Sequence, residues 1–96
     1  MSLAKEDRVE RAREAASTRL EESVVILHTE EGTYYQLDGV GGRIWELLEE
    51  PVSFGGLVAA LVAEFEVDGS RCSADTEALL RDLLDRRMVR RVEAGR

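Results

Sequence analysis

Residues 24–37 read VVILHTEEGTYYQL, two apolar runs on either side of a charged turn. The first run, residues 24–27, is rich in β-branched side chains, and the second, residues 33–37, carries two adjacent tyrosines, so each run favours a strand. Gly32 suits the left-handed position of a type I turn followed by a bulge. The sequence therefore predicts a β-hairpin.

The expected turn fixes which side chains share a face of this hairpin. On the face that meets the helices it places Val25, Leu27, Tyr35 and Leu37. A one-residue slip would bring Val24 and Ile26 to that face instead, and the pattern leaves both registers open because the second strand is apolar on both faces. In the first register Val24 and Ile26 form an apolar patch on the opposite face, where the N-terminal tail or a partner enzyme would dock.

Helices are expected after the hairpin. Residues 41–49 (GGRIWELLE) have apolar side chains at helical spacing, with Trp45 as the expected core anchor, and Pro51 prevents extension of this first helix. A second helix begins at Ser53 and ends before the turn signal Asp68-Gly69.

A third helix would be capped by Ser70 or Ser73. Its apolar stripe consists of Leu79, Leu80, Leu83, Leu84 and Met88. We expect a short closing strand through Val89 and Val92.

The order of elements predicts an α+β fold. Residues 17–20 supply a strand before the hairpin, since an isolated two-stranded hairpin is marginal in stability. Residues 1–16 are expected to be an N-terminal tail of helix-favouring composition that can fray. Residues 17–92 then form one domain, a small antiparallel β-meander followed by three short helices in a winged-helix-like arrangement, and residues 93–96 are a C-terminal tail.

Charge and composition narrow the classes of function. The formal net charge is -7, so a polyanion would meet a repulsive field and nucleic acid is disfavoured as a partner. The single cysteine, Cys72, has no internal partner for a disulfide. No apolar run approaches the length of about 20 residues that a membrane span needs, and no export signal is evident. We expect a cytoplasmic protein that does not contact a membrane.

The sequence contains no recognisable catalytic or metal-binding motif. The only histidine, His28, is far along the chain from Cys72, and neither has the spacing of a metal ligand, so His28 is interpreted as a strand-end residue. The glycines at positions 39, 41 and 42 lack the G-x-G-x-x-G spacing and are interpreted as turn residues. We expect a binding module that is not an enzyme, with no catalytic residues, no metal site and no cofactor.

Three motifs carry a family resemblance. They are Tyr-Tyr-x-Leu at 34–37, Gly-x-x-Ile-Trp-x-Leu-Leu at 41–48, and Phe-x-Val-Asp at 65–68 ahead of Ala-Asp at 74–75. In this order they resemble the PqqD-like family, the leader-peptide recognition domains of pathways that make ribosomally synthesised, modified peptides. The chain is most similar to the free-standing versions from lasso-peptide clusters.

The resemblance implies a non-catalytic adaptor. The leader of a precursor peptide would add as a strand to the sheet edge beside the third helix, and the adaptor would present it to a separate peptidase or other maturation enzyme. The residues expected to bind the leader are Thr33, Tyr34, Tyr35, Gln36, Leu37, Ala78, Leu79, Asp82, Leu83 and Arg86. The open sheet edge would also allow a homodimer.

Two other functions fit the same order of elements. A winged-helix protein would bind DNA through residues 73–85, but that segment holds four acidic side chains against the single Arg81. A basic cluster keeps this alternative open: Arg86, Arg87, Arg90 and Arg91. The second alternative is a structural subunit that docks on an enzyme without touching its substrate.

Overall fold

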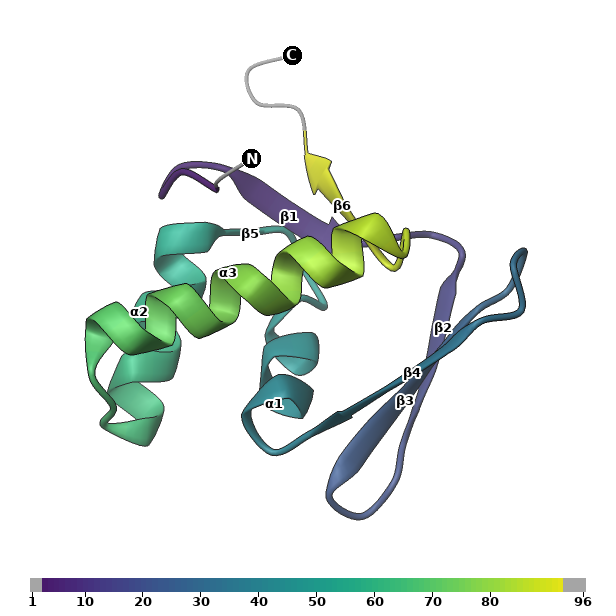
Figure 1. The fold of residues 1–96 in the computed structure, drawn as a ribbon, viewed down its shortest axis with the longest axis horizontal. Helices are drawn as coiled ribbons and strands as arrows, with labels where there is room; N and C mark the ends of the chain where they lie inside the picture. The colour runs from purple at the N-terminus through teal and green to yellow at the C-terminus, as the bar shows by residue number, and fades with distance from the viewer. Residues whose placement is uncertain (1–2, 93–96) are drawn as a thin grey trace.

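The computed structural model describes residues 3–92 and has an α+β fold (Figure 1). In chain order the elements are β1 (Arg8–Arg11), β2 (Ala15–Arg19), β3 (Ser23–His28), β4 (Tyr34–Asp38), α1 (Val40–Leu47), β5 (Val52–Ser53), α2 (Phe54–Phe65), α3 (Gly69–Asp85) and β6 (Val89–Val92). The strands form two antiparallel sheets, ordered β5-β1-β6 and β2-β3-β4. The expected meander, the helices that follow it and the closing strand are confirmed.

The N-terminal segment is a strand, which corrects the expected helix-favouring tail. β1 pairs with β6 along its whole length, from Arg8 opposite Val92 to Arg11 opposite Val89. Its one large apolar side chain, Val9, is fully buried. Tertiary pairing has overridden local helix propensity here, and the fold begins before the expected boundary at residue 17. Residues 93–96, the expected C-terminal tail, lie outside the described residues.

The β3–β4 hairpin adopts the other of the two registers. Val24 lies opposite Leu37 and Ile26 opposite Tyr35, so Val24 and Ile26 are buried under the helices and the expected placement of Val25 and Leu27 there is wrong. The cause is the turn, in which His28 and Thr33 close a four-residue loop and the Gly32 amide donates to the His28 carbonyl. Adding one residue to the expected loop exchanges the two faces of β3, while Tyr35 and Leu37 of β4 stay on the side of the helices, as expected.

His28 is a strand-end residue, as expected, and it also holds this turn together. Its side chain is 2% exposed, and its Nδ1 accepts hydrogen bonds from the backbone amides of Glu30 and Glu31 at 3.3 and 3.1 Å. These bonds satisfy two backbone N–H groups of the turn that have no partner in a neighbouring strand.

Side-chain caps start the two longer helices. Ser53 begins α2 as expected, because its Oγ accepts a hydrogen bond from the Gly56 amide at 3.0 Å. The cap of α3 is Asp68, whose carboxylate accepts from the Arg71 amide at 3.0 Å, and not Ser70 or Ser73. The expected turn residue Asp68 is therefore itself the cap, and the helix begins at Gly69.

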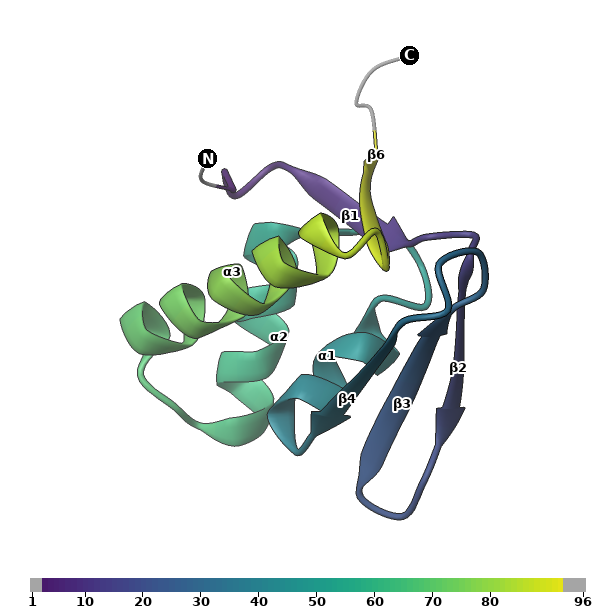
Figure 2. The ribbon, with the colours of Figure 1, turned by 45° about the vertical axis from the view of Figure 1, so that its right-hand side comes forward.

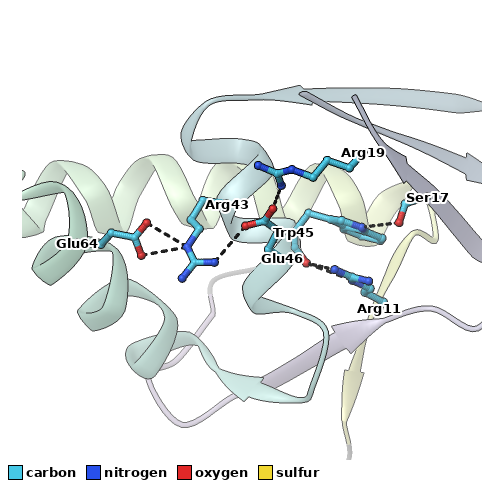
Figure 3. Close-up of polar contacts among 7 residues, drawn as sticks. All are labelled: Arg11, Ser17, Arg19, Arg43, Trp45, Glu46 and Glu64. Carbon is cyan, nitrogen blue, oxygen red and sulfur yellow. Dashed lines mark hydrogen bonds and ion pairs between the residues drawn. The ribbon is translucent and has the colours of Figure 1, made fainter. Parts of the chain in front are cut away.

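Trp45 is the core anchor and joins both sheets to α1. The indole is 1% exposed, and its Nε1 donates to Ser17 Oγ of β2 at 2.9 Å (Figure 3). Arg11 of β1 donates to the Trp45 carbonyl at 2.6 Å, and its guanidinium lies 4.6 Å from the ring centroid. The buried indole and its bond to Ser17 hold the β2-β3-β4 sheet against α1, and the contacts of Arg11 hold the β5-β1-β6 sheet there.

A chain of ion pairs continues from α1 to its neighbours. Arg43 bonds to Glu64 of α2 at 3.0 Å and to Glu46 at 3.1 Å, and Glu46 also pairs with Arg19 of β2 (Figure 3). Because these side chains are partly exposed, we expect each pair to contribute at most about 1 kcal/mol. Their main effect is to orient α1.

The register of the hairpin can be tested with two alanine substitutions. Ile26→Ala removes a fully buried side chain and should lower the free energy of unfolding by about 2–5 kcal/mol. Leu27→Ala, a matched control on the opposite face, should cost much less because Leu27 is only half-buried. Urea denaturation of both variants measures this difference, and equal losses would contradict the register.

Candidate functional site

β4 is an open sheet edge, since within residues 3–92 it pairs with β3 alone. The His28 amide donates to the Thr33 carbonyl at 2.9 Å, which identifies this pair as hydrogen-bonded. Hydrogen-bonded and non-bonded pairs alternate along an antiparallel ladder. The backbone groups of Tyr35 and Leu37 therefore point to β3, whereas those of Tyr34 and Gln36 point out from the free edge.

α3 lies beside this edge, and three side chains connect the two elements (Figure 2). The Tyr35 hydroxyl donates to Asp82 Oδ2 at 2.6 Å, and Arg86 Nε donates to Asp82 Oδ1 at 3.1 Å. The Arg86 guanidinium lies 4.7 Å from the centroid of the Tyr35 ring. This triad of Tyr35, Asp82 and Arg86 fixes how far β4 stands from α3.

The triad shifts the ionisation of its own members. The hydrogen bond from Tyr35 has the largest effect and lowers the pKa of Asp82; burial has the next largest effect and opposes it, and the hydrogen bond and charge of Arg86 also lower this pKa. The bond to Asp82 raises the pKa of Tyr35, with further contributions from burial and the carboxylate charge. At neutral pH a protonated phenol therefore donates to an ionised carboxylate, which is the stronger form of this bond.

An apolar pocket of about 310 Å³ adjoins the site at the beginning of α1 and the first half of α3. It is lined by Val40, Gly41, Ile44, Val67, Asp68, Arg71, Cys72, Asp75, Thr76 and Leu79. Gly41 allows close packing here, since a Cβ at this position would lie 3.3 Å from Leu37 and 3.7 Å from Leu79. Leu79 and Asp82 are three residues apart on one face of α3, so the pocket and the triad lie along the same side of that helix.

The structure divides the residues predicted to bind a peptide into three groups. Five residues are exposed: Thr33, Tyr34, Gln36, Ala78 and Arg86. Tyr35, Leu79 and Asp82 are half-buried between β4 and α3. Leu37 and Leu83, 4% and 0% exposed, belong to the core, so their side chains are not available to a peptide.

Sequence reasoning missed the pocket. Val40 and Val67 are 44% and 45% exposed and both line it. The signal was present in the sequence, because neither valine fits the apolar stripe of a helix. Two apolar side chains left outside every predicted core face point to a surface with another use.

The chemistry of this region is that of binding. Among the described residues no group of three or more His, Cys, Asp and Glu side chains could hold a metal ion. Cys72 is buried, and its Sγ lies 3.8 Å from Thr76 Oγ1. The site offers free backbone donors and acceptors on β4, an apolar pocket, and a charged triad between them.

Comparisons with known proteins agree with this geometry. The family model described as "Coenzyme PQQ synthesis protein D (PqqD)" matches residues 23–89. A solved structure described as "TbiB1 in Complex with the TbiA(beta) Leader Peptide" is 34% identical, with a TM-score of 0.78 over 91% of this chain and 98% of that chain. No curated protein matches.

The triad predicts a measurable ionisation of Tyr35. In a Tyr34→Phe background Tyr35 is the only tyrosine, and Asp82→Asn should lower its pKa toward the ordinary value because the ionised acceptor is lost. Asp75→Asn, on the same helix but paired with Arg71, is the control and should have no effect. Tyrosinate absorbance measured against pH reports the pKa, and an unchanged value in Asp82→Asn would contradict the contact.

The same shifts predict how stability depends on pH. Because the pKa of Tyr35 is raised on folding, its contribution is present below the ordinary tyrosine pKa and is lost as the pH rises through the raised value. Because the pKa of Asp82 is lowered, its contribution is present above the ordinary aspartate pKa and is lost as the pH falls through the lowered value. Tyr35→Phe should therefore flatten both limbs of a plot of melting temperature against pH.

Proposed function

The chain belongs to the PqqD family, and from this we propose that it is a non-catalytic adaptor that captures the leader segment of a precursor peptide. The observation that carries the proposal is the open edge of β4 beside α3 and its pocket. The likeness to a protein solved with a leader peptide, at 34% identity, supports the same function.

Strand addition would supply the affinity. Tyr34 and Gln36 each direct an N–H and a C=O away from β3, so an extended peptide can form hydrogen bonds with both residues. Such bonds do not depend on the sequence of the peptide. The edge therefore explains binding and leaves specificity to side chains.

Specificity would come from the side chains along α3. The pocket beside Leu79 would accept an apolar side chain of the leader, and the charged pair Asp82 and Arg86 would favour a polar one at the other end. Ala78 is exposed and short, which leaves room for the peptide beside the helix. The spacing of apolar and polar positions in the leader would thus be matched to this surface.

The captured leader would be presented to a separate peptidase or other maturation enzyme. We assign the chain to the lasso-peptide type on its Tyr-Tyr-x-Leu and Ile-Trp motifs. Within residues 3–92 none of the helices combines the length and apolar character needed to cross a membrane. The proposed setting is the cytoplasm, where precursor peptides are synthesised.

The DNA-binding alternative gains no support from the surface charges. The cationic cluster that kept it open is paired with acids: Arg86 with Asp82, Arg87 with Glu31, Arg90 with Glu10, and Arg91 with Asp7. α3 itself exposes Asp75 and Asp85. A helix that enters the major groove needs free cationic or amide side chains, so peptide binding is favoured.

Proline substitutions test strand addition. Tyr34→Pro removes an outward N–H and should weaken leader binding by about 0.5–1.5 kcal/mol relative to Tyr34→Ala, which lacks the same side chain but keeps the donor. Tyr35→Pro removes an N–H that pairs with β3 and should mainly lower the melting temperature. Suitable probes for calorimetry are the leader encoded in the same gene cluster and the TbiA(beta) leader.

Two outcomes decide whether the leader pairs with the β4 edge. Weaker binding by Tyr34→Pro with an intact fold supports pairing at the β4 edge. Equal affinity of Tyr34→Pro and Tyr34→Ala for a leader that binds the parent chain would show that the peptide does not pair there.

A further inference from the structure

The face of the β2-β3-β4 sheet that points away from the helices is uncharged in its two central rows, and the charged side chain that the strands add to it is Asp38 at the end of β4. Cross-strand pairs place Ala16, Leu27 and Tyr34 in one row, and Thr18, Val25 and Gln36 in the next. Leu20 follows in the alternation of β2. We call these residues the outer face: Ala16, Thr18, Leu20, Val25, Leu27, Tyr34 and Gln36. The helices lie on the other side of the sheet (Figures 1 and 2).

The outer face does not belong to the core. Val25 and Leu27 are half-buried but are not among the partly buried side chains that pack against the core. Leu20 and Tyr34 are 51% and 70% exposed. In a chain with 34% charged residues, seven adjoining uncharged side chains form a surface suited to a protein partner.

Acidic turns flank the outer face at both ends. Glu21 and Glu22 lie in the turn between β2 and β3, Glu30 and Glu31 lie in the turn between β3 and β4, and all four are exposed. Two copies packed through this face would bring like-charged turns together, and each copy has a net charge of -7. The charges therefore favour a different protein whose apolar patch is flanked by Lys and Arg.

The outer face is continuous with the proposed leader edge. Tyr34 directs its backbone groups to the free edge of β4, while its side chain stands on the outer face. A protein seated on this face would touch both the adaptor and a strand added to that edge. The occupant is thus a protein that acts on the captured peptide.

We propose that the outer face is the docking surface of the maturation enzyme, which binds it through an apolar patch with basic flanks. The identity of this partner rests on the proposed function, because only a leader-binding adaptor needs an enzyme at this edge. The face also replaces the docking patch expected at Val24 and Ile26, which are buried.

Substitutions on β2 test the proposal without touching the leader edge. Thr18→Glu with Leu20→Glu puts two charges on exposed positions and should weaken binding of the enzyme encoded in the same gene cluster about tenfold or more. Leader affinity should stay within about twofold, since β2 is two strands away from the β4 edge. Ala59→Glu with Ala60→Glu, exposed on α2, adds the same charge and should change neither affinity.

Two further variants examine the apolar and the charged parts of the face separately. Val25→Thr with Leu27→Thr removes apolar surface and places a β-branched side chain at both positions, so it should weaken enzyme binding while the strand persists. Glu21→Gln with Glu22→Gln should reduce the salt dependence of enzyme binding, because screening acts on the flanking charges. Calorimetry at two ionic strengths measures both effects.

The outcomes separate this proposal from the proposed function. Unchanged enzyme affinity in both the glutamate and the threonine variants would overturn docking on the outer face, whatever the leader affinity. A dimer of the parent chain that Thr18→Glu with Leu20→Glu dissociates in sedimentation would also overturn the proposal, since a second copy would then occupy the outer face. Leader peptides that fail to bind the parent chain would overturn the proposed function, and enzyme binding lost in the same variants would still support the docking surface.

Discussion

The burial of Trp45 is the contact on which the arrangement of this protein depends. Its indole fills the core under α1, donates to Ser17 of β2 and lies beneath the guanidinium of Arg11 from β1. One side chain thus holds two separate sheets on one helix. The β2-β3-β4 sheet is thus held by this tryptophan at β2 and by the Tyr35, Asp82 and Arg86 triad at β4.

The register of the β3–β4 hairpin determines which residues lie on each face of the sheet and which backbone groups lie on its free edge. The four-residue turn at His28 buries Val24 and Ile26, leaves Val25 and Leu27 on the outer face, and turns the backbone of Tyr34 outward. A turn one residue shorter would exchange the roles of Val24 and Ile26 with those of Val25 and Leu27. Core packing, the free β4 edge and the outer face are therefore coupled through a single loop.

The sequence predicted most helices and strands, but it predicted less well which strands pair and which side chains meet. Periodicity located the helices and the Ser53 cap, and β-branched composition located β3, because these signals are local. The strand character of β1 was hidden, since it arises from pairing with β6 at the far end of the chain. At the site, Tyr35, Asp82 and Arg86 were predicted individually, but their mutual contact and the pocket at Val40 and Val67 depend on how α1 and α3 approach, which no local pattern encodes.

The pairing of β1 with β6 also constrains the order of folding. Glu10 and Arg90, which form an ion pair across these strands, are 80 positions apart, whereas β2, β3 and β4 are joined by short turns. At a synthesis rate of about 5–20 residues per second, β1 waits on the order of 4–16 s for its partner to emerge from the ribosome. The β2-β3-β4 meander can form in that interval, whereas β1 has only the two-residue strand β5 to pair with. The charged residues of β1, Arg8, Glu10 and Arg11, protect its open edge from aggregation. The sheet that carries the free β4 edge can thus form before the sheet that closes the fold.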